Sequence, residues 1–147
     1  MPSRRTEALF IAAIGTDGVR FVASPTPHPD MPYVVLSDVL AVLGFEAADR
    51  MALVRRLRSG AIHEVCRVYL DDEIALTVPT WIARSIARGI AGHRRGVSSL
   101  LLRLDLAARD ALAERVRLLP PSARIRWVEA ALRQSDWSDA PAHGGMA

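Results

Sequence analysis

Residues 33–45 run YVVLSDVLAVLGF, and they predict a short β-strand that leads directly into a helix. The first three residues are aromatic or β-branched, as is typical of strands. Ser37 is predicted to be the helix N-cap, and Asp38 suits the positive end of the helix dipole. Gly44 fits the position just past the helix end. The apolar side chains of the helix recur at helical spacing: Leu36, Val39, Leu40 and Leu43.

Hairpins are predicted on both sides of this segment. Residues 7–23 contain two apolar runs around the turn at residues 15–18, and residues 62–78 contain two more around Asp71-Asp72. A loop with four prolines, residues 24–32, leads from the first hairpin into the central strand. A second helix is expected over about residues 47–57.

The last part of the chain is predicted to be helical. Pro79 suits the first turn of a helix that runs to about Ala91, and residues 92–96 interrupt it with two glycines around two arginines. A long helix is expected from about residue 98 to 118, with Ser98 or Ser99 as its N-cap. A last helix is expected over about residues 122–134.

These elements predict an α+β fold, with two short β-hairpins packed with helices and followed by a C-terminal helical hairpin. We divide the chain into an α+β DNA-binding domain over residues 1–92 and a helical hairpin over residues 97–134. Residues 135–147 are predicted to be a disordered tail, since they are small, polar and contain Gly and Pro.

Positive charge is concentrated between Glu73 and Asp105, where the sequence has no acidic residue. All 19 basic residues of the chain are arginine, which a GC-rich genome explains better than selection for guanidinium chemistry does. Arginine forms bidentate hydrogen bonds with phosphate and stacks on flat rings. The acid-free segment therefore favours an anionic partner, and its arginines are Arg84, Arg88, Arg94, Arg95 and Arg103.

The helix after Pro79 is expected to place Arg84 and Arg88 on the side opposite its isoleucines, with Trp81 at the edge of the arginine face. Such a face suits phosphate contact combined with stacking, although a solvated helix of an arginine-only protein has the same pattern. Arg94 and Arg95 form a basic hinge or a simple linker. We assign Arg103 to the solvated side of the long helix.

A second basic patch ends the helix at residues 47–57. Its members are Arg55, Arg56 and Arg58. Residues 36–57 have the outline of a helix-turn-helix. Leu40 and Arg50 occupy positions that usually need a small and an apolar residue, so two packed helices of another fold are the preferred interpretation and a helix-turn-helix is the alternative.

The segment from Tyr33 to Phe45, with its Asp38-Val39 pair and its Leu43-Gly44-Phe45 end, resembles phage antirepressor (Bro-type) N-terminal domains. The order of predicted elements over residues 7–91 is similar too. The resemblance implies DNA binding and a role in phage or mobile-element regulation.

The C-terminal helices each have an apolar stripe, with Leu101, Leu104 and Ala108 on the first and Ile125, Val128 and Leu132 on the second. These stripes either complete the core of one chain or form a homodimer.

No catalytic, metal-binding or cofactor-binding constellation is recognised. The four histidines are scattered without ligand spacing, and Cys66 is the single cysteine, which fits a reducing cytoplasm. We expect a cytoplasmic DNA-binding transcriptional regulator, dimeric and without enzymatic activity. The alternative is a protein-interaction module, an antirepressor or adaptor that docks on transcription machinery without DNA affinity of its own.

Overall fold

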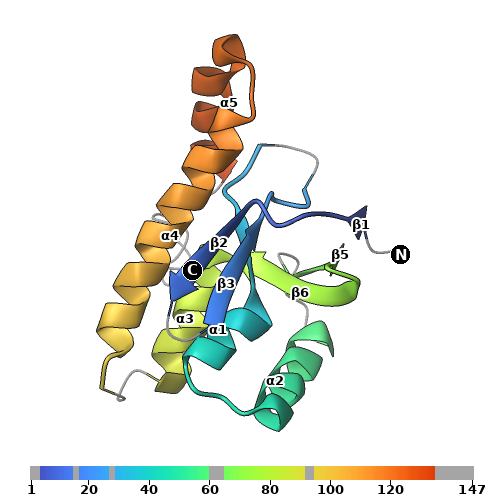
Figure 1. Cartoon of the computed structure of the whole chain (residues 1–147), viewed down its shortest axis with the longest axis vertical. Helices are drawn as coiled ribbons and strands as arrows, with labels where there is room; N and C mark the ends of the chain where they lie inside the picture. Colours follow the sequence, from blue (N-terminus) through green and yellow to red (C-terminus); the bar gives the residue numbers. More distant parts are fainter. Residues whose placement is uncertain (1–3, 15–16, 27–28, 60–64, 92–94, 135–147) are drawn as a thin grey trace, which may run out of the picture.

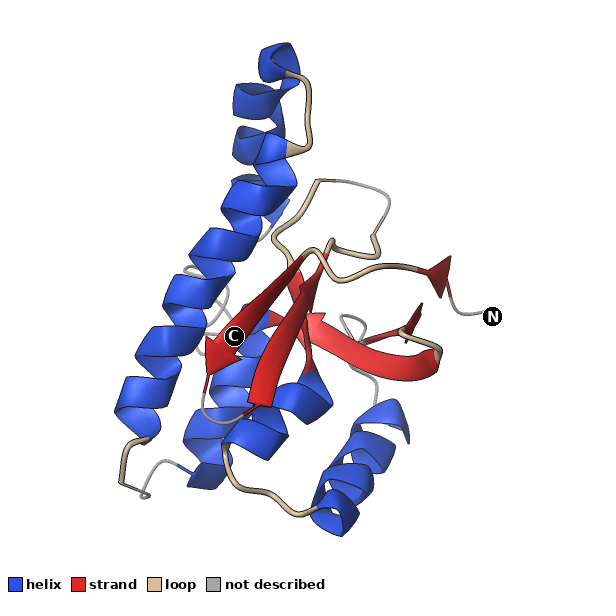
Figure 2. Cartoon of the chain, viewed as in Figure 1, coloured by secondary structure: helices blue, strands red, loops and turns tan. Residues whose placement is uncertain are grey.

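The computed structural model describes residues 4–14, 17–26, 29–59, 65–91 and 95–134. The strands are β1 (Arg4–Arg5), β2 (Phe10–Ile14), β3 (Asp17–Val22), β4 (Tyr33–Val35), β5 (Cys66–Leu70) and β6 (Glu73–Pro79). The helices are α1 (Leu36–Val42), α2 (Ala47–Ser59), α3 (Thr80–Ala91), α4 (Val97–Arg117) and α5 (Pro121–Gln134). The predicted α+β class, with its two hairpins and C-terminal pair of helices, is confirmed (Figures 1 and 2).

The central strand joins the two hairpins into one sheet. β4 pairs antiparallel with β3 on one side and with β6 on the other, which gives the order β1-β5-β6-β4-β3-β2. β2 pairs with β3, and β5 pairs with β6, each as an antiparallel hairpin. β1 adds to β5 in parallel at one edge. The short strand at residues 33–35 therefore determines how the two hairpins combine.

One face of the sheet shares a hydrophobic core with α1, α3 and α4. Phe21 and Val34 from the sheet, Leu40 from α1, Ala83 from α3 and Ala111 from α4 are all fully buried in it. The core thus extends into the long helix, across the boundary that the sequence suggested after residue 92. A smaller buried cluster lies on the other face: Val22, Tyr33, Val35, Val68, Leu70 and Ala75.

Three predicted helix starts are wrong. Pro79 is the last residue of β6 and pairs with Tyr33, so α3 begins at Thr80 and Pro79 is not in its first turn. α1 begins at Leu36 and has no side-chain cap, so Ser37 lies inside its first turn. β4 ends at Val35 and α1 begins at the next residue, so Val35 holds the N-cap position that was predicted for Ser37. α4 begins at Val97, with Gly96 in the left-handed conformation before it, so Ser98 and Ser99 are inside the helix.

The predicted end of α1 is confirmed, because Gly44 has a positive φ of 86° just beyond it. Residues 92–94 of the predicted hinge at residues 92–96 lie outside the described residues, as does the predicted tail at residues 135–147. Within the described part, none of the helices combines the length and the apolar character needed to span a membrane.

Candidate nucleic-acid interface

α3 turns its small and apolar residues to the core and leaves its arginines on one flank. Ile82, Ala83 and Ala87 are buried against the sheet and its helices. Arg84 and Arg88 lie next to Ala87 around the helix but farther from the core, because successive residues of a helix are rotated by about 100°. Arg84 reaches Asp105 on α4, so this arginine flank faces toward the long helix.

Arg84 is held by an ion pair. Its Nη1 lies 3.3 Å from Oδ2 of Asp105, and the two side chains are 30% and 36% exposed. The Nε atom of Arg84 is buried and has no hydrogen-bond partner in the part of the chain that the structure describes. The first acidic residue after the acid-free segment therefore neutralises an arginine within it, and Arg84 does not offer a free charge to a phosphate.

Trp81 and Arg84 line a groove between α3 and α4. The groove has a volume of about 360 Å³ and also includes Met31, Asp105 and Arg109. Trp81 is partly buried and packs against the main core, so only part of its ring is open to a partner. The groove thus brings together two of the predicted site residues, Trp81 and Arg84. The positive charge of Arg84 is partly balanced by Asp105.

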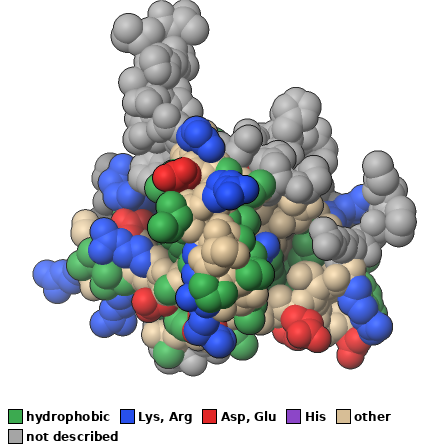
Figure 3. Space-filling model, turned by 90° about the horizontal axis from the view of Figure 1, so that it is seen from above, with side chains coloured by type: hydrophobic (Ala, Val, Ile, Leu, Met, Phe, Trp, Pro, Cys, Tyr) green, Lys and Arg blue, Asp and Glu red, His purple; other side chains and the backbone are tan. Residues whose placement is uncertain are grey.

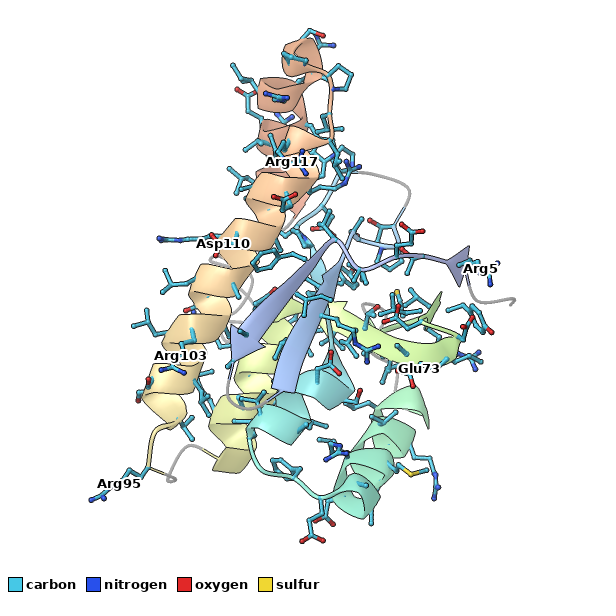
Figure 4. The ribbon with its side chains drawn as sticks, viewed as in Figure 1. Arg5, Glu73, Arg95, Arg103, Asp110 and Arg117 are labelled. Carbon is cyan, nitrogen blue, oxygen red and sulfur yellow. The ribbon has the colours of Figure 1, made fainter. Side chains whose placement is uncertain are left out.

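Arg88 and Arg95 are exposed at the end where α3 gives way to α4. Neither makes an ion pair with any residue that the structure describes, and Arg95 points away from the body of the protein at the start of α4 (Figure 4). Arg94, expected to act beside them, lies outside the described residues. This end of the molecule therefore keeps two of the predicted phosphate contacts open to solvent.

The second predicted patch lies on α2. Arg55 and Arg56 are exposed there, while the side chain of Arg58 is outside the described part. α2 packs on α1, and Arg50 stabilises the connection by donating a 2.6 Å hydrogen bond from Nη1 to the carbonyl oxygen of Phe45. Arg50, which argued against a helix-turn-helix, thus has a structural role in this turn.

Asp71 and Glu73, at the acidic turn, are bound by Arg20, which the sequence did not single out. Arg20 donates to both carboxylate oxygens of Asp38, at 2.9 and 3.0 Å, and to Asp71 and Glu73 at 3.2 and 3.1 Å. The hydrogen bond to Asp38, opposed by partial burial, holds the pKa of Arg20 above its usual value. The guanidinium of Arg20 is therefore charged, and this cluster has a structural role because it connects β3 with α1 and with the acidic turn.

The apolar stripes of the C-terminal helices differ in burial. Leu101 and Leu104 on α4 complete the main core, whereas Ile125 and Leu132 on α5 are 76% and 54% exposed. Seen from the end of the molecule that carries the turn between α4 and α5, hydrophobic and basic side chains lie next to each other (Figure 3). Of the two predicted stripes, the one on α5 is therefore the one open to a protein partner.

Comparisons with protein-family models, with curated proteins and with solved structures find no match to this chain. The functional argument accordingly depends on the geometry and charge of the chain itself.

Proposed function

We propose that the protein is a small DNA-binding regulator of phage or mobile-element type that contacts the DNA backbone through exposed arginines. The observation that carries this proposal is that Arg55, Arg88 and Arg95 are exposed and have no carboxylate partner among the described residues. Unpaired guanidinium groups bind phosphate oxygens without first breaking an internal ion pair. Phosphate contacts of this kind position a protein on DNA and supply most of its non-specific affinity.

A titration of labelled random duplex DNA at about 50 and 200 mM salt tests the proposal, since each phosphate contact adds about 0.9 to the slope of log affinity against log salt. We expect affinity to fall steeply with salt. The triple variant Arg55→Gln, Arg88→Gln, Arg95→Gln should bind more weakly and with a shallower slope. The matched control is the triple variant Arg67→Gln, Arg103→Gln, Arg126→Gln. It removes the same amount of charge from three other exposed arginines, which have no ion pair among the described residues.

The proposal is wrong if the duplex does not bind, or if its affinity is the same at both salt concentrations. It is also wrong if the control triple loses as much affinity as the test triple, because the effect would then come from net charge alone.

The second candidate function is a protein-interaction module, an antirepressor or adaptor that docks on transcription machinery without DNA affinity of its own. The exposed Ile125 and Leu132 on α5 favour it, because large apolar side chains exposed on one helix are typical of an interface. Leu101 and Leu104 cannot serve in such an interface, since both are buried in the core. DNA binding by the isolated chain distinguishes the first function from the second.

A further inference from the structure

A polar cleft lies between the N-terminal segment, the proline-containing loop and the C-terminal helices. It is separate from the arginine surface, by which we mean Arg55, Arg88 and Arg95. Its volume is about 420 Å³, within the ~300–1,000 Å³ range of small-molecule sites. We call it the Arg115 cleft. The lining residues used below are Arg5, Ser24, Thr26, Asp30, Arg115 and Trp127.

Arg115 differs from every other half-buried arginine of the described chain. Arg20 and Arg84 bind carboxylates, and Arg50 and Arg124 donate to backbone carbonyl oxygens. Arg115 has no such acceptor among the described residues, and its guanidinium carbon instead lies 5.0 Å from the centre of the Trp127 ring. Partial burial of a cation costs free energy unless an anion or acceptor compensates it. A bound anion would provide this compensation.

The contact with Trp127 also restricts Arg115 before a ligand binds. A guanidinium attracted to the face of an indole ring keeps its N–H groups available for hydrogen bonds. Less side-chain entropy is then lost when two parallel hydrogen bonds form with a phosphate.

Arg5 brings a second cation to the same cleft. It lies over the ring of Tyr69 at 5.7 Å and makes a 3.8 Å ion pair with Asp72, in which the side chains are 81% and 88% exposed. An ion pair this long and exposed contributes little, so Arg5 can turn to a ligand at small cost.

The remaining lining suits the organic part of a ligand. The hydroxyl groups of Ser24 and Thr26 lie 2.7 Å apart, and Asp30 accepts a 2.7 Å hydrogen bond from the backbone N–H of Met31. Hydroxyl and carboxylate oxygens are hydrogen-bond partners for the hydroxyl groups of a ligand. The cleft thus offers cations for an anionic group and hydroxyl and carboxylate oxygens for a polar body.

We propose that the Arg115 cleft binds a small phosphate monoester whose organic part carries hydroxyl groups, of the size of a sugar phosphate or a mononucleotide. Arg115 and Arg5 hold the phosphate, and Ser24, Thr26 and Asp30 contact the hydroxyl-bearing part. The site goes beyond the proposed DNA binding and does not depend on it, since none of its residues belongs to the arginine surface on α2 and α3.

Calorimetric titration of the full chain tests this proposal, with ribose 5-phosphate, a nucleoside 5′-monophosphate, the matching nucleoside and inorganic phosphate as separate probes. We expect at least one phosphate monoester to bind more tightly than both the nucleoside and inorganic phosphate. Which ester binds better distinguishes a sugar phosphate from a mononucleotide as the ligand.

Arg115→Gln should weaken that binding by about tenfold or more, because hydrogen bonds to a charged group are among the strong ones. Arg115→Lys, which keeps the charge but not the fork, should have an intermediate effect. Arg103→Gln is the matched control on the same helix, and we expect it to change affinity less than about twofold. Thermal unfolding of each variant shows whether the fold is retained, and Ser24→Ala gives a second, smaller loss if Arg115→Gln does not fold.

The proposal is overturned if no ester binds at about 1 mM, the weak limit of a useful site. Equal binding of inorganic phosphate and the esters also overturns it, as does equal affinity of Arg115→Gln and the unmodified chain. Binding that is seen only with DNA oligonucleotides contradicts a small-molecule site.

Discussion

Arg20 connects three parts of the chain that are distant in sequence. It lies on β3, while its partners Asp38, Asp71 and Glu73 belong to α1, to the turn of the second hairpin and to the first residue of β6. Asp38 is the closest partner and also accepts a 2.9 Å hydrogen bond from the backbone N–H of Arg20. The side chains of Arg20 and Asp38 are 19% and 13% exposed, so water screens this pair less than the pairs with Asp71 and Glu73.

Asp38→Asn should lower the free energy of unfolding by about 2 kcal/mol, because it weakens a charged, mostly buried hydrogen-bond group. Asp71→Asn should cost less, about 0.5 kcal/mol, because that carboxylate is largely exposed. Urea unfolding followed by circular dichroism measures both values. Equal costs for the two variants would show that the position of Asp38 gives it no special role.

Residue partners of this kind could not be predicted from the sequence. The charge of the segment between Glu73 and Asp105 was evident, and so was the acidic turn. The ion pairs were not, because Arg20 and Asp71 meet only once the two hairpins share a sheet. Likewise Arg84 meets Asp105 only because α3 packs against α4. Ion pairs between distant elements depend on tertiary geometry, which residue patterns alone do not contain.

Two glycines of the helical region have opposite requirements. Gly96 precedes α4 with a φ of 88°, where an L-residue is strained, although a Cβ there would meet no atom within 4 Å. Gly89 lies within α3 and is exposed, and a Cβ there also meets nothing within 4 Å. Space is therefore equal at the two sites, and only the backbone conformation differs.

Gly96→Ala should destabilise the protein by about 1–2 kcal/mol, the cost of a left-handed conformation for an L-residue. Gly89→Ala should stabilise it by about 0.5–1 kcal/mol, because alanine loses less backbone entropy in a helix. Denaturant midpoints of the two variants give the comparison. Stabilisation by Gly96→Ala would mean that the residue does not hold a positive φ in solution.

Local signals predicted the elements well where the chemistry is local. The turn at Asp71-Asp72 is an example: both residues have positive φ, 50° and 62°, and aspartate tolerates this conformation better than most residues. The helix starts were less predictable. Serine is a common N-cap residue, but Ser37 and Ser98 both lie inside the first turn of their helices. At α1 the preceding strand, not the serine, determines where the helix begins.

The packing of α4 decides how much of the chain is needed to fold. Its buried residues Val97, Leu101, Leu104, Ala107, Ala108 and Ala111 all belong to the main core. The sequence suggested a separate helical hairpin. An apolar stripe shows that one side of a helix is buried, but it does not show which other element covers that side. The outward stripe of α5 could not be distinguished from the inward stripe of α4 for the same reason.

A chain that ends at Gly96 should fail to unfold cooperatively, because loss of α4 exposes the sheet side of the core. A chain that ends at Leu119 should retain a cooperative thermal transition, since α5 contributes few buried residues. Circular dichroism during heating distinguishes these outcomes. Cooperative unfolding of the shorter chain would establish residues 1–96 as an independent domain.

The order of the sheet has a consequence for behaviour at high concentration. β1 is only two residues long, and both are arginines, yet it occupies the edge beside β5. A strand at a sheet edge normally offers unpaired backbone groups to which another chain can add, and this is a common route to aggregation. A very short, cationic edge offers few such groups and repels a second copy of itself. The first residues of the chain thus shield the second hairpin from intermolecular strand pairing.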